Sequence, residues 1–433
     1  MKYKKYPQYK DSGVEWLGKV PTEWLVMQFR RITNLQQGLQ IPQENRFTEG
    51  NEETIEYITI KSLNAGSNRE HKEYIRKPST RVQCTKDDVL LARTGATGEV
   101  VTNIKGVFHN NFFKVNYDKT KISKLYLVYL LKTKELKSHL LMLAGTTTIP
   151  DLNHGAFLST GIPLPFFQEQ QTIANYLDKT TAKIDTLIEK QTKLIELLKE
   201  KRQAVISTTV TRGLDSSVPM KDSGVEWLGE IPEQWEVKKL KHIGEAIIGL
   251  TYSPTNIVDE NEGTLVLRSS NLQNGGLYYG DNVYVNSAIP DKLIVKSGDI
   301  VICSRNGSRK LIGKNAMIDK QSAGVSFGAF TSVFRSKQNP FVFYILNSSL
   351  FKYQSGRFMT TTINQLTTGT LNEFKIAFPS ASEQLEIVNY LADKTSKIDT
   401  LISKATKAIE LLKERRAALI SAVVTGKIDV REE

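Results

Sequence analysis

The sequence offers few side chains that are arranged for catalysis. The stretch from Gly307 to Asn315 resembles a phosphate-binding loop, but five residues instead of four separate its glycines, and Asn315 stands where a hydroxyl would hold magnesium. The histidines lack the HExxH spacing of a zinc site, so we expect them to be ordinary surface or core residues. They are His71, His109, His139, His154 and His242.

No other motif supplies a catalytic centre. No Gly-rich loop follows a predicted strand as it does in dinucleotide-binding folds, and the sequence has no Asn-Pro-Pro-Tyr-like segment of the kind adenine methyltransferases use. We therefore expect no catalytic residue, no metal site and no cofactor bound by this chain. Any catalysis must come from a partner.

The charge balance indicates a polyanionic partner. The 433 residues include 58 Lys and Arg against 46 Asp and Glu, a formal net charge of +12. No Lys/Arg-rich helix with a bulky apolar face is present, which favours nucleic acid over a membrane surface. Charge alone leaves open a basic protein without such a partner.

Two long helices must position the remaining polar side chains. Residues 171–202 and 385–416 are the same segment repeated, with 21 of 32 positions identical and no Pro or Gly. Apolar residues recur at a three-four spacing, in a stripe that includes Ile184, Leu187 and Leu401. Each segment predicts an amphipathic helix about 48 Å long, which exceeds one small core and needs a partner of matching length.

We expect the two helices to pack against each other as an antiparallel coiled coil. The alternatives are two unrelated core helices, or helices that each pair with another protein.

The duplication extends beyond the helices. Residues 11–18, Asp-Ser-Gly-Val-Glu-Trp-Leu-Gly, return unchanged at 222–229. Between the ends the halves diverge and keep only short landmarks, such as Gly38-Leu39 against Gly249-Leu250. A further landmark matches Arg93-Thr94-Gly95 with Arg305-Asn306-Gly307. The four tryptophans near the starts of the halves are expected to seat each domain against the helices; they are Trp16, Trp24, Trp227 and Trp235.

The predicted fold class is α+β: two tandem mixed α/β domains separated by two long helices with pseudo-two-fold symmetry. Short runs bounded by Gly, Asn, Ser and Asp predict strands, for example at 55–60, 89–91, 265–267 and 300–302. Helices are predicted at 125–143 and 341–353. The expected boundaries are a first domain at 1–166, the central long helix at 167–210, a linker at 211–221, a second domain at 222–379 and the C-terminal long helix at 380–425.

Cysteine usage and the absence of a leader predict a cytoplasmic protein. Cys84 and Cys303 do not occupy matching places in the two halves, which argues against a disulfide framework. The amino terminus lacks an apolar signal core, and the sequence contains no 18-residue apolar run.

A duplicated basic chain with two equal arms suits a DNA duplex, which has local two-fold axes perpendicular to its length. Halves that differ in their middle regions indicate two different half-sites. A helical arm of about 48 Å bridges up to roughly 14 base pairs at about 3.4 Å each.

The sequence resembles the specificity (S) subunits of type I restriction–modification systems. The resemblance rests on the Ser-Gly-Val-Glu-Trp-Leu-Gly opening, the Asp-Ile/Val…Arg-x-Gly landmark and the Ile-Asp-Thr-Leu-Ile…Leu-Leu-Lys-Glu helix, each present twice over essentially the whole chain. The first half departs from it, with Lys86-Asp87-Asp88 where the second has Ser297-Gly298-Asp299.

The resemblance implies a non-catalytic DNA-binding subunit. Two target recognition domains would each read half of a bipartite sequence, while the helices set the spacing and dock two methyltransferase (M) subunits. S-adenosylmethionine, ATP and magnesium would be bound by the M subunits and by restriction/translocase (R) subunits.

Base readout in the major groove uses Arg or Lys for guanine and Asn or Gln for adenine. Our candidates in the first domain are Gln36, Gln37, Lys61, Asn64, Asn68, Arg69, Arg93 and Thr94. Those in the second are Arg268, Asn271, Arg305, Asn306, Arg309 and Lys310. An alternative for Arg93 and Arg305 is a structural arginine that supports its loop. The threonines at 146–148 and 360–362 are either phosphate contacts or turns.

Polar positions shared by both helices are candidates for the M-subunit interface, although a solvated face has the same pattern. They are Asn175, Tyr176, Lys183, Lys190, Lys193 and Arg202, with Asn389, Tyr390, Lys397, Lys404, Lys407 and Arg416.

Two other classes of function remain open from the sequence. One is a scaffold that homodimerises through its helices and binds DNA without sequence preference. The other is an enzyme, such as a nuclease or a fused methyltransferase.

Overall fold

The computed structural model describes residues 4–61, 72–145, 150–273, 275–358 and 364–431. The chain divides into two compact units. Unit 1 holds residues 1–191 together with 407–433, and unit 2 holds 192–406. The expected domain boundaries at 166 and 379 therefore differ from the limits of the units, because each unit includes part of both long helices.

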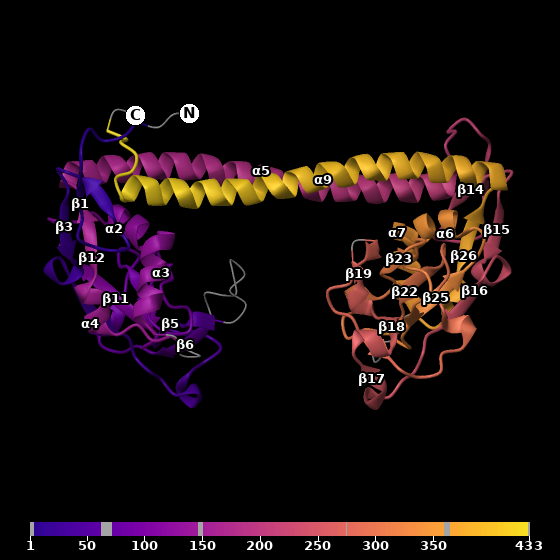
Figure 1. Cartoon of the computed structure of the whole chain (residues 1–433), viewed down its shortest axis with the longest axis horizontal. Helices are drawn as coiled ribbons and strands as arrows, with labels where there is room; N and C mark the ends of the chain where they lie inside the picture. Colours follow the sequence, from indigo (N-terminus) through magenta and orange to yellow (C-terminus); the bar gives the residue numbers. More distant parts are fainter. Residues whose placement is uncertain (1–3, 62–71, 146–149, 274, 359–363, 432–433) are drawn as a thin grey trace. The chain divides into compact units, whose positions relative to one another are not determined.

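Unit 1 contains two four-stranded sheets (Figure 1). In the first the strand order is β4-β11-β8-β9, and in the second it is β6-β5-β10-β7. The first sheet comprises β4 (Thr33–Gln37), β11 (Phe112–Tyr117), β8 (Leu90–Ala92) and β9 (Val100–Val101). The second comprises β6 (Glu73–Arg76), β5 (Thr54–Ile58), β10 (Gly106–Phe108) and β7 (Gln83–Cys84).

Unit 2 repeats this design with different side chains. Its first sheet has the order β16-β25-β22-β23, and its second has β17-β21-β18-β24. The first sheet comprises β16 (Glu245–Ile248), β25 (Thr331–Arg335), β22 (Ile300–Cys303) and β23 (Asn315–Met317). The second comprises β17 (Ile257–Val258), β21 (Tyr284–Val285), β18 (Thr264–Leu267) and β24 (Ser326–Phe327). The predicted strands at 55–60, 89–91, 265–267 and 300–302 are present, with ends shifted by one or two residues.

Short β-ribbons begin and end each unit's sheet region. They pair β1 (Tyr9–Asp11) with β2 (Lys19–Pro21), β3 (Leu25–Gln28) with β12 (Gly161–Leu164), β13 (Met220–Asp222) with β14 (Glu230–Pro232), and β15 (Glu236–Lys239) with β26 (Lys375–Phe378). A further hairpin, β19 (Leu272–Gln273) with β20 (Gly276–Leu277), belongs to unit 2.

The long helices are α5 (Phe167–Arg212) and α9 (Ala381–Val424), both longer than the repeated segments predict. They pack antiparallel, as Figure 1 shows. In unit 1, Ile173 and Leu177 of α5 share a buried core with Leu419 of α9. The predicted fold of two mixed domains and two antiparallel helices is therefore confirmed.

An equivalent ion pair joins the two long helices in each unit. In unit 1, Arg416 Nε lies 2.9 Å from Asp185 Oδ1, and in unit 2, Arg202 Nε lies 2.9 Å from Asp399 Oδ1. Asp185 and Asp399 are equivalent positions of the repeat, as are Arg202 and Arg416. Both contacts therefore hold the same antiparallel register.

The tryptophan of each half that follows the duplicated opening seats its unit on a long helix, as predicted. Trp24 and Trp235 are fully buried. Trp24 Nε1 donates to Glu169 in the first turn of α5 at 3.1 Å, and Trp235 Nε1 donates to Glu383 in the first turn of α9 at 2.9 Å. The earlier pair, Trp16 and Trp227, is only half-buried.

Each predicted shorter helix is divided in two. The segments are α2 (Lys124–Leu131) and α3 (Lys134–Leu143) in unit 1, and α6 (Asn339–Leu346) and α7 (Ser349–Phe358) in unit 2. The break has a local cause, because the buried hydroxyls of Thr133 and Ser348 donate to the carbonyl oxygens of Leu130 and Ile345, three residues earlier. One small helix follows in each unit, α4 (His154–Ser159) and α8 (Thr368–Asn372).

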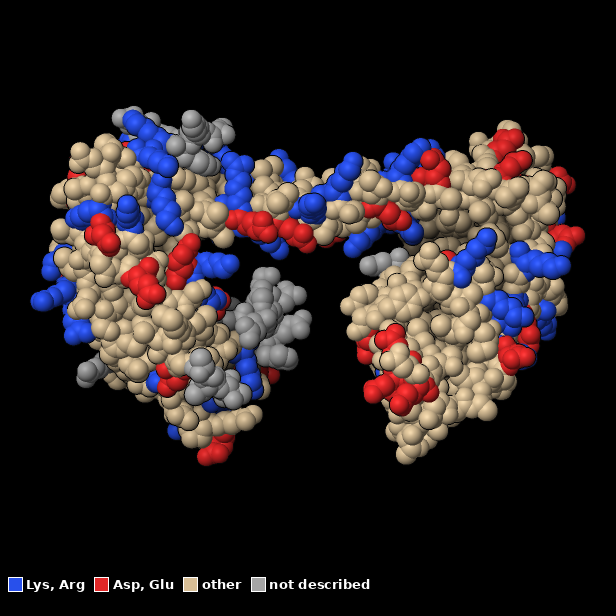
Figure 2. Space-filling model, viewed as in Figure 1, with Lys and Arg blue, Asp and Glu red and all other residues tan. Residues whose placement is uncertain are grey.

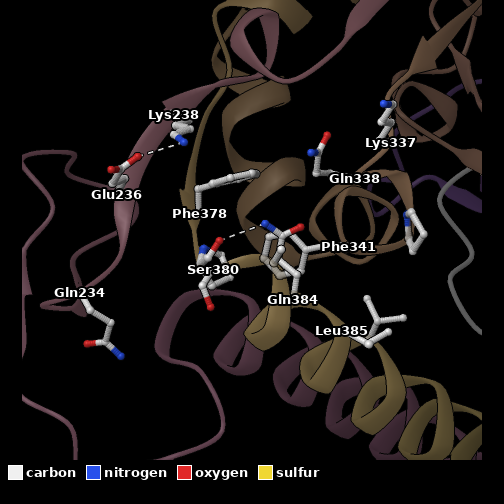
Figure 3. A pocket seen from close by; sticks show the side chains of 14 residues that line it. Gln234, Glu236, Lys238, Lys337, Gln338, Phe341, Phe378, Ser380, Gln384 and Leu385 are labelled. Atoms are coloured by element: carbon white, nitrogen blue, oxygen red, sulfur yellow. Dashed lines mark hydrogen bonds and ion pairs between the residues drawn. The ribbon is translucent and has the colours of Figure 1, made fainter.

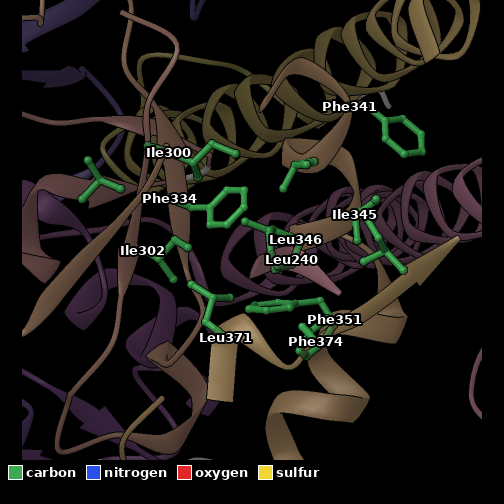
Figure 4. Packing of buried hydrophobic residues seen from close by; sticks show 14 of the residues in the cluster. Leu240, Ile300, Ile302, Phe334, Phe341, Ile345, Leu346, Phe351, Leu371 and Phe374 are labelled. Carbon is green, nitrogen blue, oxygen red and sulfur yellow. The ribbon is translucent and has the colours of Figure 1, made fainter. Parts of the chain in front are cut away.

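The core of unit 2 joins the sheet to these helices. Figure 4 shows Ile300 and Phe334 from the first sheet near Phe351 and Phe374, and all four side chains are buried. The α6–α7 pair in turn contacts α5, since Gln203 Nε2 donates to Asn347 O at 2.9 Å. The sheets are thereby fixed to the long helix.

Two glycines allow the sheets of each unit to approach closely. A Cβ atom on Gly38 would lie 2.1 Å from Phe108 O, and one on Gly249 would lie 2.3 Å from Gly328 O. Such distances are shorter than any van der Waals contact. These glycines are the landmark that both halves share, and the close approach explains why neither position carries a side chain.

We expect Gly249→Ala to destabilise unit 2 by about 1–3 kcal/mol, because the methyl group meets backbone that cannot move aside. The midpoint of thermal unfolding should fall by several degrees. Gly307→Ala is the matched control, since a Cβ atom there meets nothing within 4 Å. An unchanged midpoint for Gly249→Ala would contradict the steric argument.

Candidate nucleic-acid interface

Each unit has a short turn between its two sheets, at residues 109–111 in unit 1 and 328–330 in unit 2. In unit 1, His109 N donates to Ile58 O, and Asn110 N donates to Leu39 O, both at 2.9 Å. Gly328 N and Ala329 N make the same bonds to Leu267 O and Leu250 O in unit 2, also at 2.9 Å. The backbones of the two turns are therefore held in the same way, and residues 109–111 correspond to 328–330.

The side chains on these turns differ completely. Unit 1 carries His109, Asn110 and Asn111, whereas unit 2 carries Gly328, Ala329 and Phe330. Polar and apolar chemistry thus occupy the same backbone positions.

In unit 1 the turn forms a polar surface. Asn110 Nδ2 donates to Gln40 Oε1 at 2.9 Å. The His109 ring lies 5.8 Å from the Tyr57 ring, and its Nδ1 accepts from Asn111 N at 3.0 Å. Burial lowers the pKa of His109, so the ring is neutral near pH 7.

In unit 2 the turn borders a pocket of about 490 Å³. Leu250, Tyr252 and Phe330 form its apolar side, and Arg268 and Asp281 form its polar side. Arg268 Nη2 lies 2.8 Å from Asp281 Oδ1, while Arg268 Nε is buried without a hydrogen-bond partner. The ion pair fixes the guanidinium group at the pocket wall.

An exposed arginine stacks on the turn of unit 2. The Arg305 guanidinium carbon lies 5.3 Å from the centre of the Phe330 ring, and 59% of Phe330 is exposed. Arg305 makes no ion pair with any residue that the structure describes. A cation over an exposed ring is an arrangement that can contact both phosphate and a base.

The alignment of the Arg-x-Gly landmark made from the sequence differs by one residue from the alignment of the two units in the structure. Thr94 bridges to Asp151, and Arg305 makes the corresponding bridge to Gln365. Arg305 therefore corresponds to Thr94, and Arg93 corresponds to Ser304. The matching of Arg93 with Arg305 is corrected by one residue.

Arg93 makes the intramolecular contacts expected of the structural alternative. Its Nη2 lies 2.6 Å from Asp151 Oδ2, and its guanidinium carbon lies 5.4 Å from the centre of the Phe113 ring. The Thr94 hydroxyl donates to the same carboxylate at 2.6 Å. These hydrogen bonds, the one from Thr94 first, lower the pKa of Asp151.

Asn271 is a correction among the base-reading candidates. It has no exposed surface, and its Nδ2 donates to Tyr278 O at 2.9 Å while its Oδ1 accepts from Arg268 N at 2.8 Å. A buried amide with both ends bonded cannot reach a base edge. Its role is to cap the short turn after β18.

The remaining candidates lie in several places. In unit 1, Gln36 and Gln37 lie on β4, and Lys61 is exposed after β5. In unit 2, Asn306 Nδ2 donates to Ser269 Oγ at 3.2 Å, and Arg309 and Lys310 are exposed. The predictions for Asn64, Asn68, Arg69, Thr146–Thr148 and Thr360–Thr362 fall outside the described residues.

Sequence reasoning missed Gln40, Asn110 and Asn111 in unit 1 and Tyr252 and Phe330 in unit 2. A signal for them existed, because each turn directly follows a phenylalanine, Phe108 or Phe327, that ends a buried strand. Tyr252 and Phe330 were missed because aromatic side chains were not counted as base-reading candidates. Gln40, Asn110 and Asn111 are of a counted type, but their position at the turn depends on the fold.

The long helices expose more apolar surface than predicted. Leu187 and Leu401 were assigned to the buried stripe, but they are 47% and 49% exposed. Leu197 and Leu411, a second equivalent pair, are 50% and 55% exposed. Apolar positions that recur on both helices yet face solvent are a feature of binding surfaces.

The polar candidates on the helices fall into two groups. Asn175 and the three lysine candidates of the first helix face solvent, as do their counterparts on the second; the lysines are Lys183, Lys190 and Lys193, with Lys397, Lys404 and Lys407. Figure 2 shows positive and negative side chains interspersed along the helices. Arg202 and Arg416 instead make the interhelical ion pairs, which gives them a structural role.

A second pocket in unit 2 lies where α9 begins (Figure 3). Its volume is about 540 Å³, and Phe341, Phe378 and Leu385 contribute apolar surface. Lys238 Nζ lies 4.5 Å from the centre of the Phe378 ring. Gln384 closes one side through a 3.0 Å hydrogen bond from Nε2 to Pro379 O.

Over the described ranges, no three His, Cys, Asp or Glu side chains gather as a metal site would require. None of the helices in the described part of the chain has both the length and the apolar character needed to cross a membrane.

Comparison with known proteins gives a consistent family. A model of the type I restriction modification DNA specificity domain matches residues 21–197 and again 232–411. The type I restriction enzyme MjaVIII specificity subunit of Methanocaldococcus jannaschii is 28% identical over 370 residues, which cover 83% of each chain. The type I restriction enzyme EcoKI specificity subunit of Escherichia coli K12 is 26% identical over 207 residues, which cover 46% of this chain and 44% of that protein.

Two solved structures share the fold. A chain from work on complex assembly and conformational transition of the type I R-M system has a TM-score of 0.66 at 16% identity. The HsdS subunit from Thermoanaerobacter tengcongensis has a TM-score of 0.52 at 14% identity. Each alignment covers 94% of this chain and 98% of the other. Because the specificity-domain model covers both halves of the duplicated sequence, the chain belongs to the type I restriction–modification DNA specificity family.

Proposed function

We propose that this chain is the DNA-reading subunit of a type I restriction–modification complex and that each unit reads one half of a bipartite, asymmetric target. The observation that carries the proposal is the pair of turns at 109–111 and 328–330. The two turns make the same main-chain hydrogen bonds but carry different side chains. We expect this of two units that contact the same kind of partner but recognise different sequences. The net charge of +12 supports binding to the phosphate backbone.

The domain organisation follows from the proposal. Residues 1–166 and 222–379 act as the two target recognition domains, 167–210 and 380–425 as the long helices, and 211–221 as the linker between the halves. The length of the continuous antiparallel helices would set the spacing between the half-sites. Each residue added to or removed from a helix changes that length by about 1.5 Å.

The partners would be two M subunits, and R subunits in the full complex. The equivalent exposed leucines of the helices, Leu187 with Leu401 and Leu197 with Leu411, support docking of one M subunit on each unit. The exposed lysine candidates, Lys183, Lys190 and Lys193 with their counterparts, would form the polar rim around them. S-adenosylmethionine, ATP and magnesium belong to those partners in this proposal.

The proposal places the complex in the cytoplasm with its DNA. Both cysteines, Cys84 and Cys303, are buried free thiols. Burial raises the pKa of Cys84 to about 11, which keeps this thiol protonated and unreactive at neutral pH.

The function is tested by expressing the chain with its candidate methyltransferase subunit and mapping modified adenines across the host genome. We expect methylation at one motif made of two short specified sequences with an unspecified gap. A stable complex that binds DNA with no preference among sequences would instead favour the scaffold alternative. Activity of the chain alone on DNA would favour the enzyme alternative.

Spacing is tested by removing one heptad from both helices at once, residues 190–196 and 404–410, so that the antiparallel register is kept. Seven residues correspond to about 10 Å, or about three base pairs. The gap in the methylated motif should change by about that amount, while the specified bases stay the same. Changed bases with an unchanged gap would refute the spacing role.

Docking is tested with Leu187→Glu and Leu401→Glu, separately and together. Each change places a charge on an apolar contact but retains a good helix former. Native mass spectrometry should show one M subunit lost in each single variant and both lost in the double variant. Thr186→Glu and Thr400→Glu are controls at neighbouring exposed positions and should leave the stoichiometry intact. Full assembly of the double leucine variant would contradict the assignment.

A further inference from the structure

We propose that the turn residues 109–111 and 328–330 decide which bases each unit reads, and that the pocket beside Gly328 accepts the 5-methyl edge of a thymine in the half-site of unit 2. The inference rests on the proposed function and assigns the bases to particular side chains. His109 and Gly328 differ in their side chains although their main chains make the same hydrogen bonds.

Gly328 lines the pocket of unit 2 and brings no side chain to it. The corresponding residue in unit 1 is His109, whose imidazole lies against Tyr57. A Cβ atom on Gly328 would lie 3.5 Å from the Val266 side chain and 3.8 Å from the Tyr252 ring. These are ordinary van der Waals distances, so the backbone does not require glycine here. Gly328 is therefore a position where the main chain would accommodate a side chain that unit 2 lacks.

The neighbouring positions make one side of this space apolar. Ala329 and Phe330 replace Asn110 and Asn111, and Tyr252 and Leu250 complete the lining. In the major groove only thymine presents an apolar group, its 5-methyl, and alanine and phenylalanine are side chains that contact it. A guanine or cytosine edge against this wall would lose hydrogen bonds that water otherwise supplies.

The opposite side of the pocket carries the Arg268–Asp281 ion pair. The ion pair with Asp281 orients Arg268, and Arg305 stacks on Phe330 at the turn. The exposed guanidinium group of Arg305 favours the approach of the phosphate backbone. The pocket volume of about 490 Å³ admits the edge of a base together with ordered water.

Unit 1 offers the opposite chemistry at the same places. The Asn110 amide is held to Gln40, and Asn111 and Thr94 stand where unit 2 has Phe330 and Arg305. Asn and Gln side chains pair with the N6 and N7 atoms of adenine. Thymine methyl groups should therefore matter to unit 2 and not to this turn of unit 1.

The experiment measures binding of the complex of this chain with its methyltransferase subunits to the motif found by methylation mapping. Exchanging residues 30–160 for those of a relative identifies the half-site of unit 1, and the other half-site belongs to unit 2. Each thymine is then replaced by uracil, which removes only the methyl group. We expect one replacement in the unit 2 half-site to weaken binding about four-fold, the effect of one buried methylene-sized group.

Variants at Gly328 test whether the pocket causes the difference between thymine and uracil. Gly328→His fills the space as His109 does in unit 1, and it should bind thymine and uracil DNA equally. Gly328→Ala is a smaller change that fits the available distances, and it should reduce the discrimination in part. In both variants, replacements in the unit 1 half-site should have the same effect as in the native chain.

The outcomes separate this inference from the proposed function. A native complex that shows no motif contradicts the proposed function itself. A native complex that keeps its motif overturns only this inference if the unit 2 half-site lacks thymine, if uracil binds as well as thymine, or if Gly328→His discriminates as before.

Discussion

The antiparallel contact between α5 and α9 is the constraint on which both units depend. A helix of 46 residues is about 69 Å long and cannot bury its apolar stripe in one small core. The core of unit 1 is therefore completed by residues from the far end of the chain, including Leu419, Val423 and Val430. Neither the first half of the sequence nor the second contains a full set of core residues for its own sheets.

The contacts between the two sheets are the same in both units, whereas the side chains on the turns differ. The glycines at 38 and 249 and the backbone bonds of the turns hold the two sheets together, and they are equal in both units. The hydrogen bonds that the turns at 109–111 and 328–330 share come from the main chain, so the side chains there differ without changing these bonds. In the proposed function, such positions are where base recognition would change while the shared main-chain bonds stay the same.

Sequence reasoning predicted the repeat, the long helices, their antiparallel packing and four strands, because these depend on periodicity and identity. It failed for residues whose role depends on whether the side chain is buried. Leu187 matched the apolar stripe by spacing, but the pairing leaves it exposed, and Asn271 matched a base-reading type but is buried. Arg93 was matched with Arg305 because three similar residues can be aligned in more than one way. The backbone bridges in the structure fix the alignment and pair Arg305 with Thr94 instead. The pocket beside Gly328 brings together residues that are far apart in the sequence, such as Leu250, Arg268 and Phe330, which no residue-type search detects.

The distribution of identity within the chain agrees with what each surface contacts in the proposed complex. The helices must present one surface twice to the same kind of partner, and 21 of 32 positions in their repeated segment are identical. The turns must contact two different sequences, and none of their three positions is identical. Packing alone does not account for this contrast, because exposed helix positions such as Lys183 and Lys397 are also retained. A surface that binds the same partner in both units is expected to keep its residues, whereas a surface that contacts only solvent is free to vary.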